Sequence, residues 1–275
     1  RDPPMRSVRR SSEGAVAEVV IVEHPDVGGE LVARHIASRV RAQPDFTLGV
    51  ATGSTPLPVY AALARECAAG LDLSRVVAFA LDEYVGLPRQ HPESYHSVIQ
   101  REVTEPLGLD PSLVRVPDGD EATIATAGER YEAELTAHGG VDLQLLGIGT
   151  DGHVGFNEPG SSLASLTRIK TLTASTRADN ARFFDAPEQV PTHCITQGIG
   201  TILRARHLVL LAFGAGKADV IAAAVEGPVT ATLPGSCIQL HAHVTVVVDE
   251  AAATSFERAS YYRWVYEHKP AWQGL

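Results

Sequence analysis

The stretch LQLLGIGTDGHVGFNEP, residues 143–159, decides the fold. Its first half is a short apolar run without polar alternation, which predicts a strand covered on both faces, as in a parallel sheet. Gly147, Gly149 and Gly152 then allow a sharp turn and bring the backbone close to a ligand. The stretch therefore indicates a buried strand that leads into a functional loop.

The loop after this strand contains four residues that can carry chemistry: Asp151, His153, Asn157 and Glu158. Two carboxylates beside an imidazole can hold the ring in one tautomer and tune its proton affinity, which proton transfer needs. Two alternatives stay open, because Asp, His and Glu also bind metals and because Asp and Asn are common turn residues. The loop has no H-x-H or H-x-x-x-H pair and no nearby cysteine, which favours proton chemistry over a metal site.

Strands alternate with helices on both sides of this stretch. Apolar runs predict buried strands at residues 18–23, 46–51, 76–81, 208–213 and 244–248. Helical spacing and turn residues predict helices at 25–42, 56–69, 122–138, 214–225 and 251–266, and another that begins near Ser94. This alternation predicts a single α/β domain over residues 18–275, built on a doubly wound, mostly parallel sheet of the Rossmann-like type.

Two segments do not fit the alternation. Residues 1–17 are polar and carry four arginines, so we expect a flexible N-terminal extension. Residues 161–184 are polar and without clear periodicity, and we expect an irregular, mobile lid there.

The composition restricts the partners and the location. The chain has 275 residues, 33 of them acidic and 23 basic, and its formal net charge is -10. Such a field repels nucleic acid and anionic membranes, so an anionic substrate must be held by a local group of donors. Cys67, Cys194 and Cys237 are odd in number and far apart, which indicates reduced thiols. No apolar stretch approaches the roughly 18 residues that span a membrane, and we therefore expect a cytoplasmic protein.

Two turns at predicted strand ends have the features of anion sites. Thr52, Gly53, Ser54 and Thr55 precede Pro56 at a helix start, where free backbone N–H groups and the helix dipole attract anions. Capping of the helix by Ser54 or Thr55 would explain the same residues. The second turn, residues 214–217, ends in Lys217 and matches neither a Walker loop nor a dinucleotide fingerprint. Together the turns indicate a phosphorylated small molecule rather than a nucleotide.

Asp82 follows the buried strand at 76–81 directly. Such a carboxylate could merely cap the next element. Like charge from Glu83 and from Asp151 would raise its pKa, and a raised pKa suits a base that works near neutral pH. Ligands of open parallel sheets bind beyond the carboxyl ends of the strands, so the sequence places Asp82 in the same crevice as both turns.

Five segments resemble the glucosamine-6-phosphate deaminases, also called glucosamine-6-phosphate isomerases. They are LGVATGSTPLPVYAAL, FALDEYVGL followed by HPESYHSVI, LLGIGTDGHVGFNEPGSSLAS, RIKTLTASTRADNARFF and VEGPVTATLPGSCIQLH. The resemblance extends from Glu18 to about Glu250, and DEYVGL together with DGHxxFNEP is highly specific. It implies the conversion of glucosamine 6-phosphate to fructose 6-phosphate and ammonia by ring opening, isomerisation through an enol and deamination, without a cofactor or a metal.

The resemblance also implies roles for individual residues. Asp82 matches the base that removes the C2 proton and returns it to C1. His153 matches the acid/base of ring opening, and Asp151 and Glu158 match the carboxylates that orient it. The phosphate-binding positions of the family match Thr52, Gly53, Ser54, Thr55, Arg182 and Lys217.

Many members of the family are hexamers that N-acetylglucosamine 6-phosphate activates at subunit interfaces. Ser161, Ser162, Arg168 and Lys170 match the effector-binding positions. The resemblance therefore implies a homo-oligomer and an allosteric effector, both as hypotheses. The chain after Ala259 aligns poorly, and there Tyr261 or Tyr262 would have to replace an effector-site tyrosine.

Three rival functions are weighed against this one. A 6-phosphogluconolactonase-like hydrolase shares the fold and the G-x-G-x-D-G-H motif, but its motif continues with a Ser-Leu-Phe-Pro type sequence where this chain has residues 156–159, FNEP. A sugar-phosphate-sensing transcription regulator needs a helix-turn-helix domain, for which 17 residues before the first strand are too few. A galactosamine-6-phosphate deaminase stays open, since the sequence does not show how the C4 hydroxyl is recognised.

Overall fold

A computed structural model describes residues 17–270 and 273–275 of the chain. The predicted N-terminal extension lies outside the described residues, except for Ala17, which begins the first strand. Its boundary at residue 17 stays a prediction. Among the described residues, no helix combines the length and the apolar character that crossing a membrane requires.

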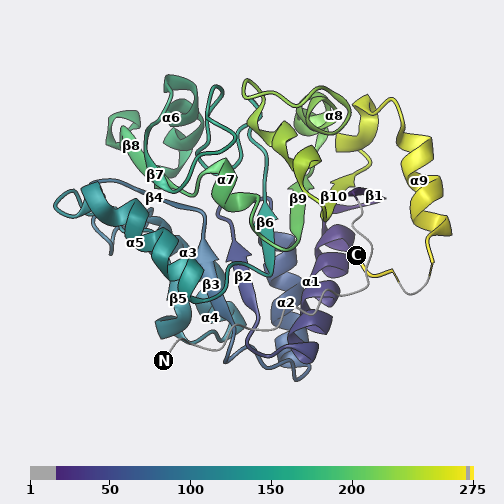
Figure 1. Ribbon diagram of the computed structural model, residues 1–275, viewed down its shortest axis with the longest axis horizontal. Helices are drawn as coiled ribbons and strands as arrows, with labels where there is room; N and C mark the ends of the chain where they lie inside the picture. The colour runs from purple at the N-terminus through teal and green to yellow at the C-terminus, as the bar shows by residue number, and fades with distance from the viewer. Residues whose placement is uncertain (1–16, 271–272) are drawn as a thin grey trace.

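Seven parallel strands form the main sheet, in the order β1-β10-β9-β6-β2-β3-β5 (Figure 1). The strands are β1 (Ala17–Val22), β2 (Thr47–Val50), β3 (Val77–Ala80), β5 (Val114–Arg115), β6 (Leu143–Leu146), β9 (Leu208–Ala212) and β10 (Val244–Asp249). All five residues of β9 and all four of β6 are buried, which confirms strands covered on both faces. The chain runs outward in opposite directions from the neighbours β2 and β6, so the sheet is doubly wound and its switch point lies between them.

Helices cover both faces of this sheet. One face packs against α1 (Pro25–Ala42), α2 (Leu57–Ala68), α3 (Tyr95–Ile99), η1 (Gln100–Thr104) and α4 (Glu105–Leu107). The other face packs against α5 (Ile124–Ala137), α7 (Ile199–Ile202) and α8 (Ala218–Glu226). Val32, Ile36 and Val40 repeat every four residues and are buried on the sheet-facing side of α1. Each such side chain contributes about 1.5–3 kcal/mol through burial.

The remaining helical pieces are short. They are η2 (Pro111–Leu113), η3 (Ala181–Phe183), η4 (Pro187–Gln189), η5 (Ala215–Lys217), η6 (Pro234–Leu240) and η7 (Ala252–Ser255). The single helix predicted at 251–266 is wrong in detail, because buried Phe256 is extended and separates η7 from α9 (Ala259–His268). Helix α9 packs against β1 at the end of the sheet (Figure 1).

A second, antiparallel sheet contains β4 (Asp82–Tyr84), β8 (His193–Thr196) and β7 (Arg168–Thr171), in the order β4-β8-β7. The strand predicted at 76–81 is correct for β3, but the chain continues after Leu81 into this other sheet. The irregular segment expected at 161–184 is wrong in part, since it contains β7 and α6 (Ala174–Asn180). The burial of β7 alternates because only one of its faces is covered, and its polar sequence therefore resembles a loop.

Candidate active site

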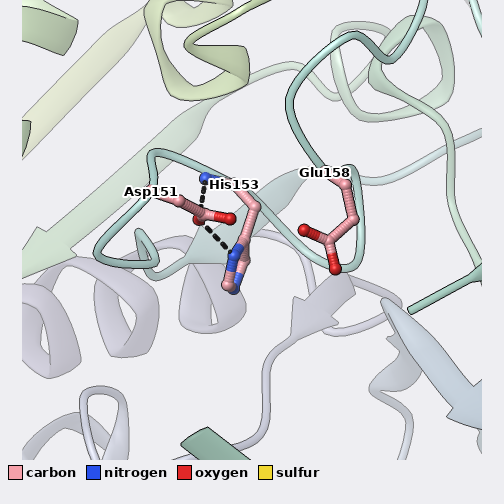
Figure 2. Close-up of side chains that lie close together, drawn as sticks. All are labelled: Asp151, His153 and Glu158. Carbon is pink, nitrogen blue, oxygen red and sulfur yellow. Dashed lines mark hydrogen bonds and ion pairs between the residues drawn. The ribbon is translucent and has the colours of Figure 1, made fainter. Parts of the chain in front are cut away.

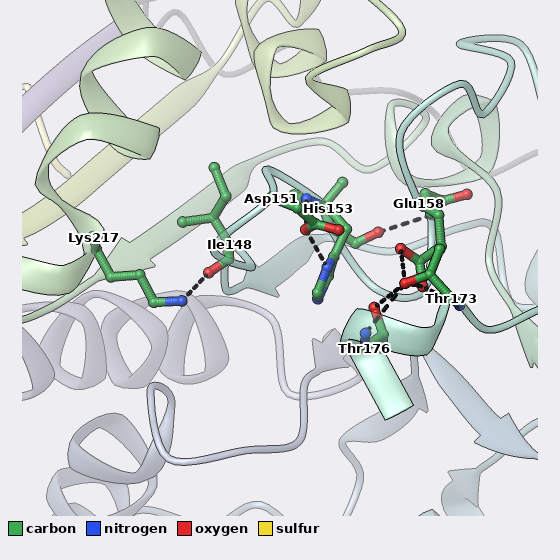
Figure 3. A network of polar contacts seen from close by, with 9 residues as sticks. Ile148, Asp151, His153, Glu158, Thr173, Thr176 and Lys217 are labelled. Carbon is green, nitrogen blue, oxygen red and sulfur yellow. Dashed lines mark hydrogen bonds and ion pairs between the residues drawn. The ribbon is translucent and has the colours of Figure 1, made fainter. Parts of the chain in front are cut away.

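The candidate site lies at the switch point of the main sheet. The turn after β2 holds residues 52–55, and the loop after β6 holds residues 147–158. These two turns are neighbours: a Cβ placed on Gly147 would lie 3.8 Å from the Thr55 Cβ. The turn after β9 reaches the same place, because Lys217 Nζ donates to the Ile148 carbonyl at 2.8 Å (Figure 3). The structure thus brings together the turn after β2, the loop after β6 and the turn after β9, as the sequence predicted.

Asp151 and His153 form a close pair on the loop after β6 (Figure 2). Oδ1 of Asp151 lies 2.6 Å from His153 Nδ1 and accepts from the His153 backbone N–H at 3.1 Å. Its hydrogen bond with His153 lowers the pKa of Asp151 to about 2, so this carboxylate is ionised at neutral pH. An ionised carboxylate can only accept, which assigns the proton to Nδ1 and leaves Nε2 as the nitrogen that can take a proton.

Two glycines allow this arrangement. A Cβ on Gly149 would lie 2.2 Å from the His153 Cε1, so the imidazole occupies space that any other residue would fill. Gly152 has a φ of +88°, and a Cβ there would lie 2.2 Å from Leu233 Cδ1. The glycines in G-x-G-x-D-G-H therefore seat the histidine ring against the backbone.

Glu158 completes this side of the site. Its side chain is buried, and its carboxylate lies within 4.8 Å of the ligand atoms of both Asp151 and His153. The Thr173 backbone N–H donates to Glu158 Oε1 at 3.3 Å, and Thr173 Oγ1 accepts from the Thr176 N–H at 3.1 Å as the N-cap of α6 (Figure 3). Glu158 therefore connects the loop at residues 147–158 to the segment at residues 161–184, which was expected to be a lid.

The same three side chains could in principle hold a divalent ion. Among the described residues they are the one group of three potential ligands with all ligand atoms within 4.8 Å of one another. The 2.6 Å contact between Asp151 Oδ1 and His153 Nδ1 leaves no room for an ion between these atoms. The donor set therefore suits a proton-transfer pair better than a metal centre.

Asp82 lies at the start of β4 and is 5% exposed. Burial, and next the charge of Glu83, raise the pKa of Asp82 to about 8, while the Thr196 hydroxyl and the Phe156 N–H act in the opposite direction. Of the two acidic residues expected to add like charge, Glu83 acts on Asp82 and Asp151 does not contribute. A carboxyl with this pKa is an effective proton acceptor near neutral pH.

Glu83 has a structural task of its own. It accepts from the backbone N–H of Tyr84, Tyr95 and His96, at 2.7, 2.8 and 2.8 Å. It thereby satisfies N–H groups in the first turn of α3 and ties this helix to the strand that bears Asp82. Burial raises the pKa of Glu83 as well.

The turn at residues 52–55 keeps its donors available. Pro56 occupies the N-cap of α2, and no side chain caps this helix. The capping explanation for Ser54 and Thr55 is therefore wrong, and anion binding remains as an explanation for this turn. Gly53 has a φ of +89°, with no atom within 4 Å of its added Cβ, so the turn is open toward solvent.

Lys217 and Arg182 provide positive charge. Burial lowers the pKa of Lys217, and Arg182 acts in the same direction, which places the guanidinium within electrostatic range of Lys217. Arg182 is exposed and packs over the Phe183 ring at 4.7 Å. Asp179 acts on Lys217 in the opposite direction to Arg182 and more strongly. Two cations within electrostatic range of each other suit the binding of a phosphate dianion.

The residues predicted for an effector have different environments. Ser161 is buried, and its Oγ has no hydrogen-bond partner among the described residues. Ser162 is exposed. Arg168 is half-buried and donates from Nη1 to Asn157 Oδ1 at 2.7 Å. Lys170 lies two residues further along β7, on the same side of the strand. The loop after β6 is therefore contacted by Arg168 through its side chain and by Ser161, whose backbone N–H donates to the Glu158 carbonyl at 3.0 Å.

Two further residues of the site, Tyr95 and Thr196, were not predicted from the sequence. The Tyr95 ring stacks on Phe156, with centroids 5.7 Å apart, and its hydroxyl interacts with the Thr52 side chain. Thr196 accepts from the Phe156 N–H at 3.1 Å. Tyr95 lies within a quoted segment, HPESYHSVI, but nothing in the sequence brings it to the site. Thr196 belongs to β8, a strand that the apolar pattern did not reveal.

The chain is similar to known proteins over most of its length. A family model described as glucosamine-6-phosphate isomerases/6-phosphogluconolactonase matches residues 26–247. A glucosamine-6-phosphate deaminase of Streptomyces coelicolor is 63% identical over 260 residues, which cover 94% of this chain and 100% of the relative. A protein of the same name from Bifidobacterium longum is 58% identical over 270 residues, with coverage of 94% and 99%.

Solved structures are similar to this chain as well. A monomeric glucosamine-6-phosphate deaminase has a TM-score of 0.84 at 36% identity, and the match covers 86% of this chain and 99% of that one. A 6-phosphogluconolactonase of Trypanosoma cruzi has a TM-score of 0.70 at 18% identity, with coverage of 89% and 98%. At this low identity the second likeness shows a shared fold alone.

Proposed function

The chain belongs to the family of glucosamine-6-phosphate isomerases and 6-phosphogluconolactonases, and we infer that it is a glucosamine-6-phosphate deaminase. It converts glucosamine 6-phosphate and water to fructose 6-phosphate and ammonia. Relatives of that name match it at 63% and 58% identity over nearly its whole length. In the molecule, one observation carries the inference: the buried carboxyl of Asp82, with a pKa raised to about 8, contacts the loop that holds the Asp151 and His153 pair.

We propose that His153 opens the sugar ring. With Nδ1 bound to Asp151, Nε2 takes the proton from the anomeric hydroxyl and returns it to the ring oxygen. The ionised Asp151 stabilises the imidazolium that forms in between. Glu158 lies within 4.8 Å of this pair and is proposed to help orient the ring.

Asp82 is proposed as the base at C2. It takes the C2 proton, and the electrons of the broken C–H bond form the C1–C2 double bond. The electron pair of the C1 carbonyl moves to its oxygen, which takes a proton released by the substrate ammonium and becomes the hydroxyl of the enol. Asp82 then delivers the C2 proton to C1, and the nitrogen lone pair forms a C=N bond at C2. Water adds to that carbon and ammonia leaves, so the oxygen of water replaces the nitrogen and Asp82 returns to its starting state.

The substrate phosphate is proposed to bind the turn at residues 52–55 together with Lys217 and Arg182. The uncapped start of α2 and the two cations within electrostatic range of each other support this assignment. This end of the substrate does not react, and its binding energy serves to place C1 and C2 beside the loop.

A lactonase needs no base at C2, which separates the closest rival from this proposal. The test is release of ammonia and fructose 6-phosphate from glucosamine 6-phosphate by the purified protein, with and without a chelator. Galactosamine 6-phosphate and 6-phosphogluconolactone serve as comparison substrates. Equal release of both products that ignores the chelator supports the deaminase. Hydrolysis of the lactone without ammonia release would assign the protein to the lactonases.

We also propose that the protein is a cytoplasmic homo-oligomer that N-acetylglucosamine 6-phosphate activates through Ser161, Ser162, Arg168 and Lys170. The contact between Arg168 and Asn157 supports a link from this surface to the catalytic loop. Exposed Ile169 on the edge strand β7 supports contact between subunits there. The alternative is a monomer, because a structurally similar deaminase is described as monomeric. Light scattering measures the oligomeric state, and substrate saturation curves with and without the effector measure activation. A monomer with hyperbolic kinetics and no response to the effector would exclude both the oligomer and the activation.

A further inference from the structure

The second sheet places one hydroxyl directly beside the proposed base. In the register of β4 and β8, Thr196 is the partner of Asp82. The side chains of directly opposed residues in an antiparallel pair lie on the same face, with their Cβ atoms about 4.5–5.5 Å apart. Thr196 is completely buried, so its hydroxyl must be satisfied by protein atoms.

The hydrogen bonds of Thr196 point to the catalytic loop and to the base. Oγ1 accepts from the Phe156 N–H at 3.1 Å. Its own proton can go to the Asp82 carboxylate or to the Gln197 carbonyl at 3.3 Å. A Cβ built on Gly155 would lie 3.0 Å from Thr196 Oγ1 and 3.3 Å from Asp82 Oδ2. The two oxygens therefore line the same spot beside the loop.

We propose that Thr196 is a positioning residue for the base, and that its hydroxyl bridges the Asp82 carboxylate to the Phe156 N–H of the catalytic loop. This inference rests on the proposed function, because it assigns Thr196 to the same step at C2. The base belongs to one sheet and the loop follows a strand of the other. The Phe156 N–H acts on Asp82 directly, and Thr196 adds a second link through its hydroxyl oxygen.

The charges around Asp82 explain why the Thr196 hydroxyl matters for the ionisation of this carboxyl. The titratable groups that face Asp82 are Glu83 on its own strand, Tyr84 beside it, Tyr95 of α3, Tyr131 of α5 and Cys194 of β8. Each of them is neutral or negative, so none stabilises a carboxylate by opposite charge. The groups that favour the ionised form are the Thr196 hydroxyl and the Phe156 N–H.

The test compares Thr196→Val with Thr196→Ser. Valine keeps the β-branched shape and removes the hydroxyl, while serine keeps the hydroxyl. For Thr196→Val we expect kcat to fall about tenfold, within the range for lost general-base alignment. We expect the acidic limb of its kcat/KM profile to move toward alkaline pH by about half a unit to one unit, as loss of a hydrogen bond to the ionised form requires. Thr196→Ser should keep the wild-type profile.

A matched control is Thr201→Val. Thr201 is buried and donates to Glu132 Oε1 away from the base, so its loss reports the cost of removing a buried hydroxyl. It should lower the unfolding temperature and leave the pH profile of activity unchanged. A Thr196→Val profile that coincides with wild type would overturn the inference. Equal losses in the valine and serine variants would overturn it as well, since they would show a purely structural role.

Failure of the proposed function can be separated from failure of this inference. If the wild-type protein releases no ammonia, the function is wrong, and Asp82 can still be titrated through stability. Free energies of unfolding between pH 5 and about 9, each measured relative to the matching Asp82→Asn variant, report its pKa. Thr196→Val should move that transition to higher pH, and an unmoved transition would contradict the bridge.

Discussion

One oxygen atom of Asp151 binds His153 twice, through the ring Nδ1 at 2.6 Å and through the backbone N–H at 3.1 Å. The backbone bond fixes the turn, and the ring bond fixes the tautomer. Because both end on Oδ1, the position of His153, the proposed acid/base, and the tautomer of its ring cannot be altered independently. This coupling makes Asp151 a sharp target for mutation.

Asp151→Asn should reduce turnover about a hundredfold or more, as expected for a general acid/base in the wrong tautomer. An amide can present its N–H to Nδ1 and so stabilise the form with the proton on Nε2. The measurement is ammonia release, with Asp110→Asn as the control, since Asp110 makes the same kind of turn contact with Ser112 outside the site. Near-normal turnover of Asp151→Asn would remove His153 from the ring-opening step.

Asp82→Asn should retain substrate binding and lose turnover by about a hundredfold or more, because it removes the base at C2. Exchange of the C2 hydrogen with solvent, followed by NMR in deuterated buffer, isolates the step. Exchange at the wild-type rate in the variant would contradict the assignment. For the wild type, kcat/KM should rise with pH up to about 8, the pKa to which burial raises the Asp82 carboxyl.

The same pKa has a consequence for stability. The folded protein binds a proton at Asp82 more tightly than the unfolded chain, whose aspartates titrate near about 3.9. Asp82 therefore lowers stability as pH rises from about 4 to about 8. Asp82→Asn should be more resistant to urea than wild type at pH 8, with the difference vanishing toward pH 4. A constant difference across this range would show that Asp82 ionises normally.

Loss of Lys217 should mainly weaken binding. Lys217→Met removes the charge at the phosphate end, which contacts substrate and transition state alike, so KM should rise about tenfold or more with kcat little changed. Arg182→Met is the natural partner variant, because both cations act on the same anion. A double variant that loses less than the sum of the single losses indicates a shared phosphate. An unchanged KM for Lys217→Met would place the phosphate elsewhere.

A histidine cluster at the opposite end of the sheet should make the protein sensitive to acid. His207 precedes β9, its ring stacks on His243 with centroids 3.7 Å apart, and His35 packs edge-on at 5.3 Å. Burial, with nearby positive charge, lowers the pKa of His207 to about 2 and of His35 to about 4. The unfolded chain binds protons at these residues below about 6.5 and the folded protein does not, so stability falls as pH drops below that value.

Urea unfolding between pH 7.5 and about 4.5 checks this, with a slope near 1.4 kcal/mol per pH unit for each proton taken up. His35→Phe should reduce the slope by one proton. Equal slopes for wild type and His35→Phe would show that His35 titrates alike in both states.

The sequence predicts six of the seven strands of the main sheet because they are almost entirely buried, whereas β5, a pair of half-buried residues at the edge, was missed. A run such as residues 208–212 has no polar face, and few other structures accommodate it. The loop after β6 could be predicted for a related reason: its glycines and polar residues have no role in a core, so their pattern points to a site. The resemblance to a known family then supplies roles for these residues that periodicity alone does not give.

The second sheet could not be predicted in the same way. Residues 168–171 alternate in burial on a strand of four residues, too short a stretch for a pattern to exceed chance. Strand β4 follows β3 after Leu81 alone, and no turn residue marks the change of sheet. Thr196 was missed with its strand, because its partners are distant in sequence. Long-range pairing decides these features, and a single sequence does not record it.

The change of sheet at Leu81 separates two tasks within one enzyme. The main sheet positions His153 and the turns proposed to bind phosphate, while the second sheet positions Asp82. In the proposed mechanism, the proton acceptor therefore belongs to a sheet of three short strands that is separate from the sheet carrying the phosphate-binding groups. On this arrangement, substitutions in β4, β7 and β8 should change the step at C2 and leave the binding of the sugar phosphate unchanged.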